Sequence, residues 1–446
     1  MSIFVLGPVT FWKNAAAPNE LRFHRICLTA AFAVTLIWGA VYIGYGNSGI
    51  EDEPGQMGVI EHFALRRPGI PESLPNLPGY HFLVIYLSGD APTLQSARVV
   101  TLGLALAGLG AFAAAWRRRH GTHPGGATLL VALLPIIQPF TAMAYTDVPA
   151  MTFIFAAFWA YFSGKQVLAA SALTAACLIR QTSIVWAGYL LVLTALDCFY
   201  PRNSDSEQRV RVRWGAAFGR WIEEGRWLLL LISVGVGIIL YAGRFTLGTA
   251  HGNQLEPNLA TIHFAGVLLL LFGLPFWAAN AGAMLRDFRA SMHSRMGRTL
   301  SLTALGLGVA AALAATYINR HVWNRELFWP DPASTFVLLR NWPLVWIERI
   351  PGLRLVSGLV VIGVTAGLAY LFGRQRCARE LWLILPFGAA LLLSNGLVEP
   401  RYFIPPFALA LLFLEPSHSG LVRHIRWFGL LCVVQSAFVL DRLALW

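Results

Sequence analysis

Acidic residues that could act as a general base occur in two short polar segments of an otherwise apolar chain. Glu51, Asp52 and Glu53 follow the first long apolar run, and Asp147 lies in a turn between two later runs. A general base must reach the proton that it removes, and neighbouring acids raise the proton affinity of a carboxylate. We therefore expect the catalytic carboxylate among Asp52, Glu53 and Asp147, with Asp52 as first choice and Asp147 as its rival. Alternatively, Asp147 only caps the helix that follows it, where the helix dipole favours an acid.

Arginines that could hold an anion lie in similar polar segments. An arginine donates paired hydrogen bonds to a phosphate and stabilises charge that develops on a leaving group. The phosphate-binding candidates are Arg180, Gln181, Arg340, Arg349 and Arg401. An arginine at the end of an apolar run can also reach lipid headgroups without any catalytic role.

Aromatic and polar side chains accompany these arginines and could contact a sugar. The substrate-binding candidates are Tyr80, Tyr145, His263, Trp342, Glu399 and Tyr402. Aromatic residues at the ends of apolar runs also form the interfacial belt of membrane proteins. A single histidine such as His263 is more often a hydrogen-bonded residue at a helix end than a catalyst.

The elements that must position these residues are membrane helices. The chain of 446 residues is 57% hydrophobic and only 13% charged, whereas soluble proteins contain roughly 25% charged residues. Apolar runs that cross a bilayer, or nearly so, fall at about 26–45, 96–116, 128–143, 149–163, 166–180, 184–199, 227–245, 262–283, 300–318, 355–373, 380–395, 402–415 and 426–444. A further run, 79–88, is too short to cross and is interpreted as interfacial or re-entrant. The sequence thus predicts an all-α polytopic membrane protein with about 13 transmembrane helices.

The distribution of basic residues predicts the orientation of these helices. The net charge of +12 could indicate a nucleic-acid partner, but the arginines cluster in short segments between apolar runs. If the N-terminus is inside, about two thirds of the 34 Lys and Arg lie on the inside, as the positive-inside rule requires. We expect the N-terminus inside, the C-terminus outside, and no nucleic-acid binding. The inside segment 200–226 is either an interfacial amphipathic helix or a solvated loop.

The chain is predicted to form a single membrane-embedded domain, residues 1–446. Its external loops 46–95, 246–261 and 319–354 are expected to form the active-site face. No apolar run carries an ionisable residue at its centre, which counts against an ion-coupled transporter. The five cysteines form no CxxC pair and no acidic DxD motif is present, so we expect neither a metal site nor another cofactor.

Acids, arginines and aromatic residues on one face suit sugar transfer from a polyprenyl phosphate. The acceptor hydroxyl needs a base, and the departing phosphate needs fixed cations. A transporter or flippase of lipid-linked glycans is the alternative, although it should require a polar path across the bilayer. A structural protein without catalysis is a third possibility.

Several motifs resemble one enzyme family. The strongest are Tyr145-Thr146-Asp147, the string Arg180-Gln181-Thr182-Ser183 that leads to Trp186, and Glu399-Pro400-Arg401-Tyr402. They are similar to motifs of the dolichyl-phosphate-glucose α-1,2-glucosyltransferases, which add the last glucose to the lipid-linked N-glycan precursor. Weaker matches follow the same order along the chain: Asp52-Glu53, Leu77-Pro78-Gly79-Tyr80, Gly252-Asn253 with His263, and Arg340-Asn341-Trp342 with Arg349. This sequence departs from the family pattern at Ser183 and Asn253, where the family has Asn and Asp.

The resemblance implies a C-type glycosyltransferase (GT-C) fold. It also implies an inverting, metal-independent transfer of a hexose, glucose by analogy, from a polyprenyl-phosphate donor to a glycan or lipid-linked acceptor. The use of 32 Arg against two Lys is typical of a GC-rich bacterial genome. We therefore expect a bacterial inner (plasma) membrane protein whose active site faces the periplasm or exterior.

Overall fold

The computed structural model describes residues 18–45, 52–71, 74, 76–89, 91–200, 214–242, 258–294, 296–319, 329–330, 337–338, 342–393, 397–440 and 443–444. The first helices are α1 (Pro18–Tyr45), α2 (Glu53–Ala64), α3 (Gly79–Ser88), α4 (Leu94–His120), α5 (Gly125–Ala132), η1 (Gln138–Thr141), α6 (Asp147–Phe162), α7 (Gln166–Ile179), η2 (Gln181–Ser183) and α8 (Ile184–Phe199). They are followed by α9 (Trp214–Ala242), α10 (Ala260–Phe272), α11 (Leu274–Ser294), α12 (Met296–Ala315), α13 (Trp342–Arg349), α14 (Pro351–Phe372), α15 (Ala378–Leu393), η4 (Pro400–Phe403), α16 (Ile404–Phe413) and α17 (His418–Leu440). Three two-residue strands, β1 (Trp329–Pro330), β2 (Val337–Leu338) and β3 (Leu443–Ala444), pair in the order β1-β2-β3.

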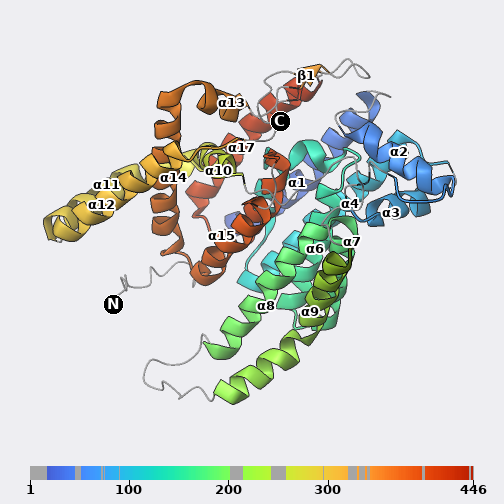
Figure 1. The fold of residues 1–446 in the computed structure, drawn as a ribbon, viewed down its shortest axis with the longest axis horizontal. Coiled ribbons are helices and arrows are strands. Elements are labelled where there is room, and N and C mark those ends of the chain that lie inside the picture. The colour runs from blue at the N-terminus through green and yellow to red at the C-terminus, as the bar shows by residue number, and fades with distance from the viewer. Residues whose placement is uncertain are drawn as a thin grey trace.

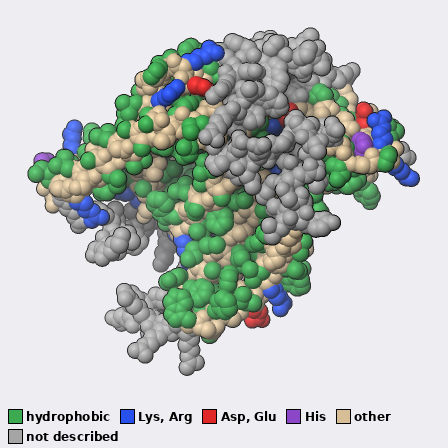
Figure 2. Space-filling view, viewed as in Figure 1, with side chains coloured by type: hydrophobic (Ala, Val, Ile, Leu, Met, Phe, Trp, Pro, Cys, Tyr) green, Lys and Arg blue, Asp and Glu red, His purple; other side chains and the backbone are tan. Residues whose placement is uncertain are grey.

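The predicted all-helical membrane architecture is confirmed (Figure 1). Within the described residues, five helices are long and apolar enough to cross a bilayer, or six if the bent pair α10 and α11 counts as one span. The predicted number of about 13 is not confirmed, because several other apolar helices have only 10 to 17 residues. At 1.5 Å per residue such a helix is shorter than the roughly 30 Å hydrocarbon layer. Figure 2 shows hydrophobic side chains over much of the visible face, as a lipid environment requires.

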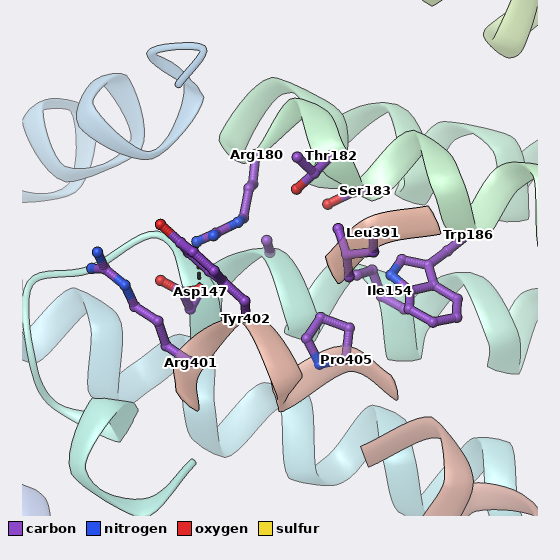
Figure 3. Close-up of a pocket in the computed structure, with 11 residues that line it drawn as sticks. Asp147, Ile154, Arg180, Thr182, Ser183, Trp186, Leu391, Arg401, Tyr402 and Pro405 are labelled. Atoms are coloured by element: carbon purple, nitrogen blue, oxygen red, sulfur yellow. Dashed lines mark hydrogen bonds and ion pairs between the residues drawn. The ribbon is translucent and has the colours of Figure 1, made fainter. Parts of the chain in front are cut away.

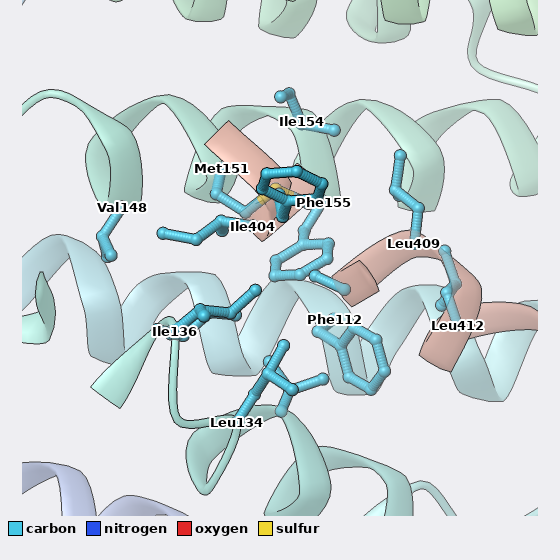
Figure 4. Packing of buried hydrophobic residues seen from close by; sticks show 14 of the residues in the cluster. Phe112, Leu134, Ile136, Val148, Met151, Ile154, Phe155, Ile404, Leu409 and Leu412 are labelled. Carbon is cyan, nitrogen blue, oxygen red and sulfur yellow. The ribbon is translucent and has the colours of Figure 1, made fainter. Parts of the chain in front are cut away.

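Helix α4 illustrates how local sequence signals define a spanning helix. Thr93 and Ser96 form a capping box at its start, and Gly121 ends it with a φ of 69°. A side chain at Gly108 would meet the Oγ1 of Thr152 at 2.7 Å, so glycine permits α6 to pack closely against α4. The core between these two helices and α16 is shown in Figure 4.

The run 128–143 does not form one crossing helix. Helix α5 ends at Ala132, and a 3-10 turn, η1, follows after a break. Pro135 and Pro139 explain the break, because proline lacks an N–H and its ring clashes with the preceding turn of a helix. The segment is nevertheless buried and contributes Leu134 and Ile136 to the core (Figure 4).

The run 262–283 is also not one straight helix. Helices α10 and α11 meet at an angle of 85° around Gly273. Pro275 cannot donate to the carbonyl of Leu271, four residues earlier, and the indole N–H of Trp427 donates to that carbonyl instead, at 2.7 Å. Helices α11 and α12 lie side by side and project from the rest of the molecule (Figure 1).

The expected external loops contain more helix than the sequence indicated. Loop 46–95 contains α2 and α3, and the short run 79–88 forms α3 itself. In the inside segment 200–226, residues 201–213 lie outside the described part, whereas Trp214 already begins the long helix α9. Most of the expected loop 246–261 and half of the expected loop 319–354 also lie outside the described residues.

Candidate functional site

Charged side chains from three helix starts meet at one end of the bundle. Asp147 is the first residue of α6, Arg180 precedes η2, and Arg401 lies within η4. Arg180 forms an ion pair with Asp147. Arg401 forms an ion pair with Glu399 and a second one with Asp52, whose Oδ2 lies 3.0 Å from the Nη1 of Arg401. Figure 3 shows Asp147 between the two arginines, with Tyr402 beside them.

The local sequence explains why these side chains converge. Pro400 restricts the preceding residue to an extended backbone, and Glu399 has φ −133° and ψ 141°. Arg180 is also extended, with φ −148° and ψ 104°, between the end of α7 and η2. Each arginine therefore lies next to a sharp change of chain direction. The guanidinium of Arg180 is directed toward Asp147 at the start of α6, whereas that of Arg401 extends away from Asp147 (Figure 3) and pairs with Asp52 and Glu399.

Two tyrosines support the arginines through their ring faces. The guanidinium carbon of Arg401 lies 5.1 Å from the Tyr145 ring centre and 5.5 Å from that of Tyr402. The guanidinium carbon of Arg180 lies 5.1 Å from the Tyr402 ring centre. Cation–π contacts of this kind are worth about 0.5–2 kcal/mol each and hold both cations in place.

The candidate bases differ sharply in access. The side chain of Asp52 is 43% exposed, and its backbone N–H donates to the hydroxyl of Tyr145 at 2.8 Å. The side chain of Asp147 is 3% exposed, and among the described residues its Oδ2 has no hydrogen-bond partner. Glu53 is fully buried and contacts Arg98. Asp52 is thus the most accessible of the three candidate bases.

Gln181 holds a neighbouring loop against this cluster. Its side-chain oxygen accepts a hydrogen bond from the N–H of Leu77 at 3.2 Å. Asn76 donates to the hydroxyl of Thr146 at 3.5 Å. The segment before α3 is therefore attached to both turns that carry the Asp147 and Arg180 motifs.

A small, partly open cavity adjoins the cluster. Its polar lining residues are Asp147, Arg180, Thr182, Ser183, Arg401 and Tyr402. Its apolar wall consists of Ala150, Ile154, Trp186, Leu391 and Pro405 (Figure 3). A ligand with a charged end and a less polar body would match this division.

Other predicted site residues lie elsewhere or outside the described part. Tyr80 is fully buried and shares a hydrogen bond of 2.8 Å with Thr101. His263 is buried and shares a hydrogen bond of 2.7 Å with Ser357. Trp342 and Arg349 are exposed at the two ends of α13, and Arg340 is not among the described residues.

Sequence reasoning missed Arg98, which forms a buried ion pair with Glu53. Arg98 is the third residue of the apolar run 96–116. An ionisable residue inside such a run is a functional hypothesis by default, and that signal could have identified it.

One group in the described part of the chain has the composition of a metal site. Ligand atoms of His120, Cys377 and Glu415 lie within 4.8 Å of one another. The Nδ1 of His120 lies 2.5 Å from a Glu415 oxygen, which is a hydrogen-bond distance, and Nε2 lies 2.8 Å from the carbonyl of Leu412. Both ring nitrogens therefore already have partners in this arrangement, which is that of an ion pair.

The fold and the site together define a polytopic helical membrane protein with a cluster of acids and arginines at the ends of its helices. The chain belongs to the DIE2/ALG10 family, whose model matches residues 85–412. This membership confirms the resemblance seen in the motifs and includes Asp147, Arg180 and Arg401 in the matched region, whereas Asp52 and Glu53 precede it.

A curated relative from Arabidopsis thaliana is 21% identical over 349 residues. It is described as "Dol-P-Glc:Glc(2)Man(9)GlcNAc(2)-PP-Dol alpha-1,2-glucosyltransferase". The match covers 64% of this chain and 65% of the relative, so the chain spans just under two thirds of that protein's length.

Among solved structures, the chain is similar to ArnT from Cupriavidus metallidurans. In the apo state the TM-score is 0.36 at 15% identity, over 92% of this chain and 78% of ArnT. With ArnT bound to undecaprenyl phosphate the TM-score is 0.35 at 15% identity, over 94% and 78% of the two chains.

Proposed function

We propose that this protein is an integral membrane glycosyltransferase of the GT-C type. It transfers a hexose, with glucose as the first candidate, from a polyprenyl-phosphate donor to a glycan or lipid-linked acceptor. The observation that carries the proposal is the cluster of Asp52, Asp147, Arg180 and Arg401 beside a cavity, in a member of the DIE2/ALG10 family. The name of the Arabidopsis relative and the paired arginines support the proposed donor class.

The proposed donor site uses Arg180 and Arg401 as phosphate ligands. Both arginines line the cavity and both are paired with carboxylates. A phosphate oxygen that binds Arg401 would compete with Asp52 for the same guanidinium. Loss of that cation raises the proton affinity of a carboxylate, so donor binding would make Asp52 a stronger base. Donor binding thereby increases the basicity of Asp52, the base that the transfer reaction requires.

In the proposed reaction, Asp52 accepts the proton of the acceptor hydroxyl as the hydroxyl oxygen attacks the anomeric carbon. The bond between that carbon and the phosphate oxygen breaks, and its electron pair stays on the phosphate. Attack from the face opposite the phosphate inverts the anomeric configuration. The phosphate gains negative charge in this step, and Arg180 and Arg401 stabilise it. Because arginines provide the positive charge, transfer should persist in the presence of a metal chelator.

Asp147 is the alternative base. It is buried at the start of α6 and one of its oxygens pairs with Arg180. Its second oxygen has no hydrogen-bond partner among the described residues and could bind an acceptor hydroxyl. We assign Asp147 to orientation of Arg180 and of the acceptor, because Asp52 is more accessible.

A reconstituted transfer assay tests the proposal. Purified protein in liposomes is given a radiolabelled polyprenyl-phosphate glucose, and a lipid-linked glycan extract serves as acceptor. We expect labelled glycan and free polyprenyl phosphate, no product from a nucleotide-activated glucose, and no loss of rate with EDTA. Movement of the labelled lipid across the bilayer without transfer would contradict the proposal and indicate a flippase.

A further inference from the structure

The carboxylate of Glu53 has an unusually complete set of partners. Arg98 donates to both of its oxygens, from Nε at 3.0 Å and from Nη2 at 2.6 Å. The hydroxyl of Tyr42 donates at 3.2 Å, and the backbone N–H of Ala144 donates at 2.8 Å. Glu53 is 0% and Arg98 1% exposed, and the guanidinium carbon of Arg98 lies 4.6 Å from the Tyr42 ring centre. A base must offer a lone pair to its substrate, and Glu53 is closed to any ligand.

The partners of Glu53 come from separate segments. Tyr42 lies near the end of α1, Arg98 near the start of α4, and Ala144 just before α6. Glu53 itself is the first residue of α2. One buried carboxylate therefore joins the start of α2 to three other parts of the bundle.

The residues next to Glu53 and Ala144 form a second contact between the same two segments, on the side of the proposed active site. Asp52 precedes Glu53, and Tyr145 follows Ala144. The N–H of Asp52 donates to the Tyr145 hydroxyl at 2.8 Å, while the Asp52 side chain meets Arg401 at 3.0 Å. The segments 52–53 and 144–145 are thus joined at two adjacent points, and the second point fixes the backbone from which the Asp52 side chain extends.

From this geometry we infer that Glu53 and Arg98 are positioning residues that hold Asp52 at the site, an inference that rests on the proposed role of Asp52 as base. Charged hydrogen bonds to both oxygens restrict Glu53 to one position and one direction, which a neutral or apolar pair would not do. A displacement of about 1 Å at a reacting group can lower a rate by about a hundredfold. The buried pair therefore affects turnover through Asp52, without touching the substrate.

Three variants separate positioning from simple stabilisation. Arg98→Lys keeps the charge but loses the paired geometry. The double variant Glu53→Gln with Arg98→Gln replaces the ion pair with two amides and leaves no unpaired buried charge. Arg119→Lys is the matched control, because Arg119 forms an ion pair with the buried Glu380 near the other end of α4.

The first measurement is turnover per molecule that binds donor, with binding stoichiometry determined by filtration of labelled polyprenyl-phosphate glucose. We expect unchanged stoichiometry and affinity, with turnover about tenfold lower for Arg98→Lys and about a hundredfold lower for the double variant. Arg119→Lys should match the wild type. A fall in binding stoichiometry with normal turnover per bound donor would show a purely structural role and overturn the inference.

The second measurement does not depend on activity. Hydrogen exchange followed by mass spectrometry reports on the amides at the start of α2, including Asp52 and Gln56, whose N–H donates to the carbonyl of Asp52 at 2.9 Å. We expect faster exchange there in the double variant and not in Arg119→Lys. Unchanged exchange would overturn the inference even if transfer is observed. Faster exchange in a protein that transfers no sugar would instead support the role of Glu53 and Arg98 in holding the backbone at Asp52, and would refute the proposed function.

Discussion

At the scale of single residues, Arg401 connects the acids of the site. It lies between Glu399, two positions earlier, and Asp52, more than 300 positions earlier, and its guanidinium faces the rings of Tyr145 and Tyr402. The three acids Asp52, Asp147 and Glu399 outnumber the two arginines. The proposed anionic donor would therefore have to displace carboxylates from the arginines, because the described residues offer no open cationic pocket.

Replacement of Asp52 should affect chemistry more than binding. For Asp52→Asn we expect a fall in kcat of about two to four orders of magnitude, the range for loss of general-base catalysis, with donor affinity retained or increased because Arg401 loses a competing anion. Single-turnover kinetics with labelled donor measure both. Glu399→Gln serves as the comparison. If Asp52→Asn turns over normally and Asp147→Asn is inactive, the base is Asp147.

Replacement of Arg401 should affect both binding and chemistry. Arg401→Ala removes a partly buried cation that faces two carboxylates, and we expect a loss of about 3–5 kcal/mol in transition-state stabilisation. Arg401→Lys should recover only part of this, because lysine cannot make paired hydrogen bonds. The ratio of kcat/KM values gives the free energy, and normal kcat/KM in Arg401→Ala would exclude Arg401 from the site.

The residues of the site were predictable in kind, but not all in direction. The motifs around Asp147, Arg180 and Arg401 predict side chains that the structure does bring together. Glu53 and Tyr80 were placed with them, although both point into the protein interior. The direction of a side chain at a helix start depends on tertiary partners such as Arg98 and Thr101, and these lie too far along the chain for a local pattern to reveal.

At the scale of elements, proline determines where apolar runs stop being helices. The runs 128–143 and 262–283 read as continuous spans by hydropathy. Pro135 and Pro275 break them, because proline has no backbone N–H to donate to the carbonyl four residues earlier. The sequence could not indicate which residue donates a hydrogen bond to the carbonyl left free at the bend, since Trp427 lies 156 residues from Leu271.

The Trp427 hydrogen bond should stabilise the bend between α10 and α11. Trp427→Phe leaves the Leu271 carbonyl without this donor, and we expect a loss of about 1–3 kcal/mol in stability. Thermal unfolding in detergent gives the change in Tm. Trp382→Phe makes the same substitution at a side chain that is 42% exposed and should change the Tm little. Equal shifts in the two variants would show that the hydrogen bond contributes nothing specific.

The His120–Glu415 contact should make stability depend on acid pH. The hydrogen bond from His120, opposed in part by burial, holds the pKa of Glu415 below its usual range. A lowered pKa stabilises the fold above the unfolded value of about 4.5 and loses this contribution as pH falls through the folded value. We therefore expect Glu415→Gln to lower stability by about 1.5–3 kcal/mol at pH 6, with the difference shrinking below about pH 4.5.

Thermal unfolding of the wild type and Glu415→Gln between pH 6 and pH 3.5 measures that difference. Glu61→Gln changes an exposed carboxylate and provides the control. A Tm difference that stays constant across this range would contradict the assignment of the stabilisation to the ionised form of Glu415.

At the scale of the whole molecule, composition predicted the class of fold but not the number of spans. An apolar run indicates only that a segment avoids water, and a buried segment such as 128–143 satisfies this without forming one helix long enough to cross the bilayer. The helices of 10 to 17 residues face the same ambiguity. The even or odd number of crossings decides on which side each loop lies, so orientation requires a direct test.

Helix α4 offers the clearest place for such a test, because it has 27 residues and meets the criteria for a span. Ala91, just before α4, and Arg118, at its other end, are both exposed. The proposed site adjoins the Ala91 end, since Arg98 near the start of α4 contacts Glu53. Arg117 to Arg119 lie at the other end, which the positive-inside rule places in the cytoplasm. Single cysteines at 91 and 118, in a protein whose native cysteines are replaced by serine or alanine, are treated with a membrane-impermeant thiol reagent in intact cells and after permeabilisation. We expect Cys at 91 to react in both cases and Cys at 118 to react only after permeabilisation. The opposite pattern would place the proposed active site in the cytoplasm, and reaction of both cysteines in intact cells would show that α4 does not cross the membrane.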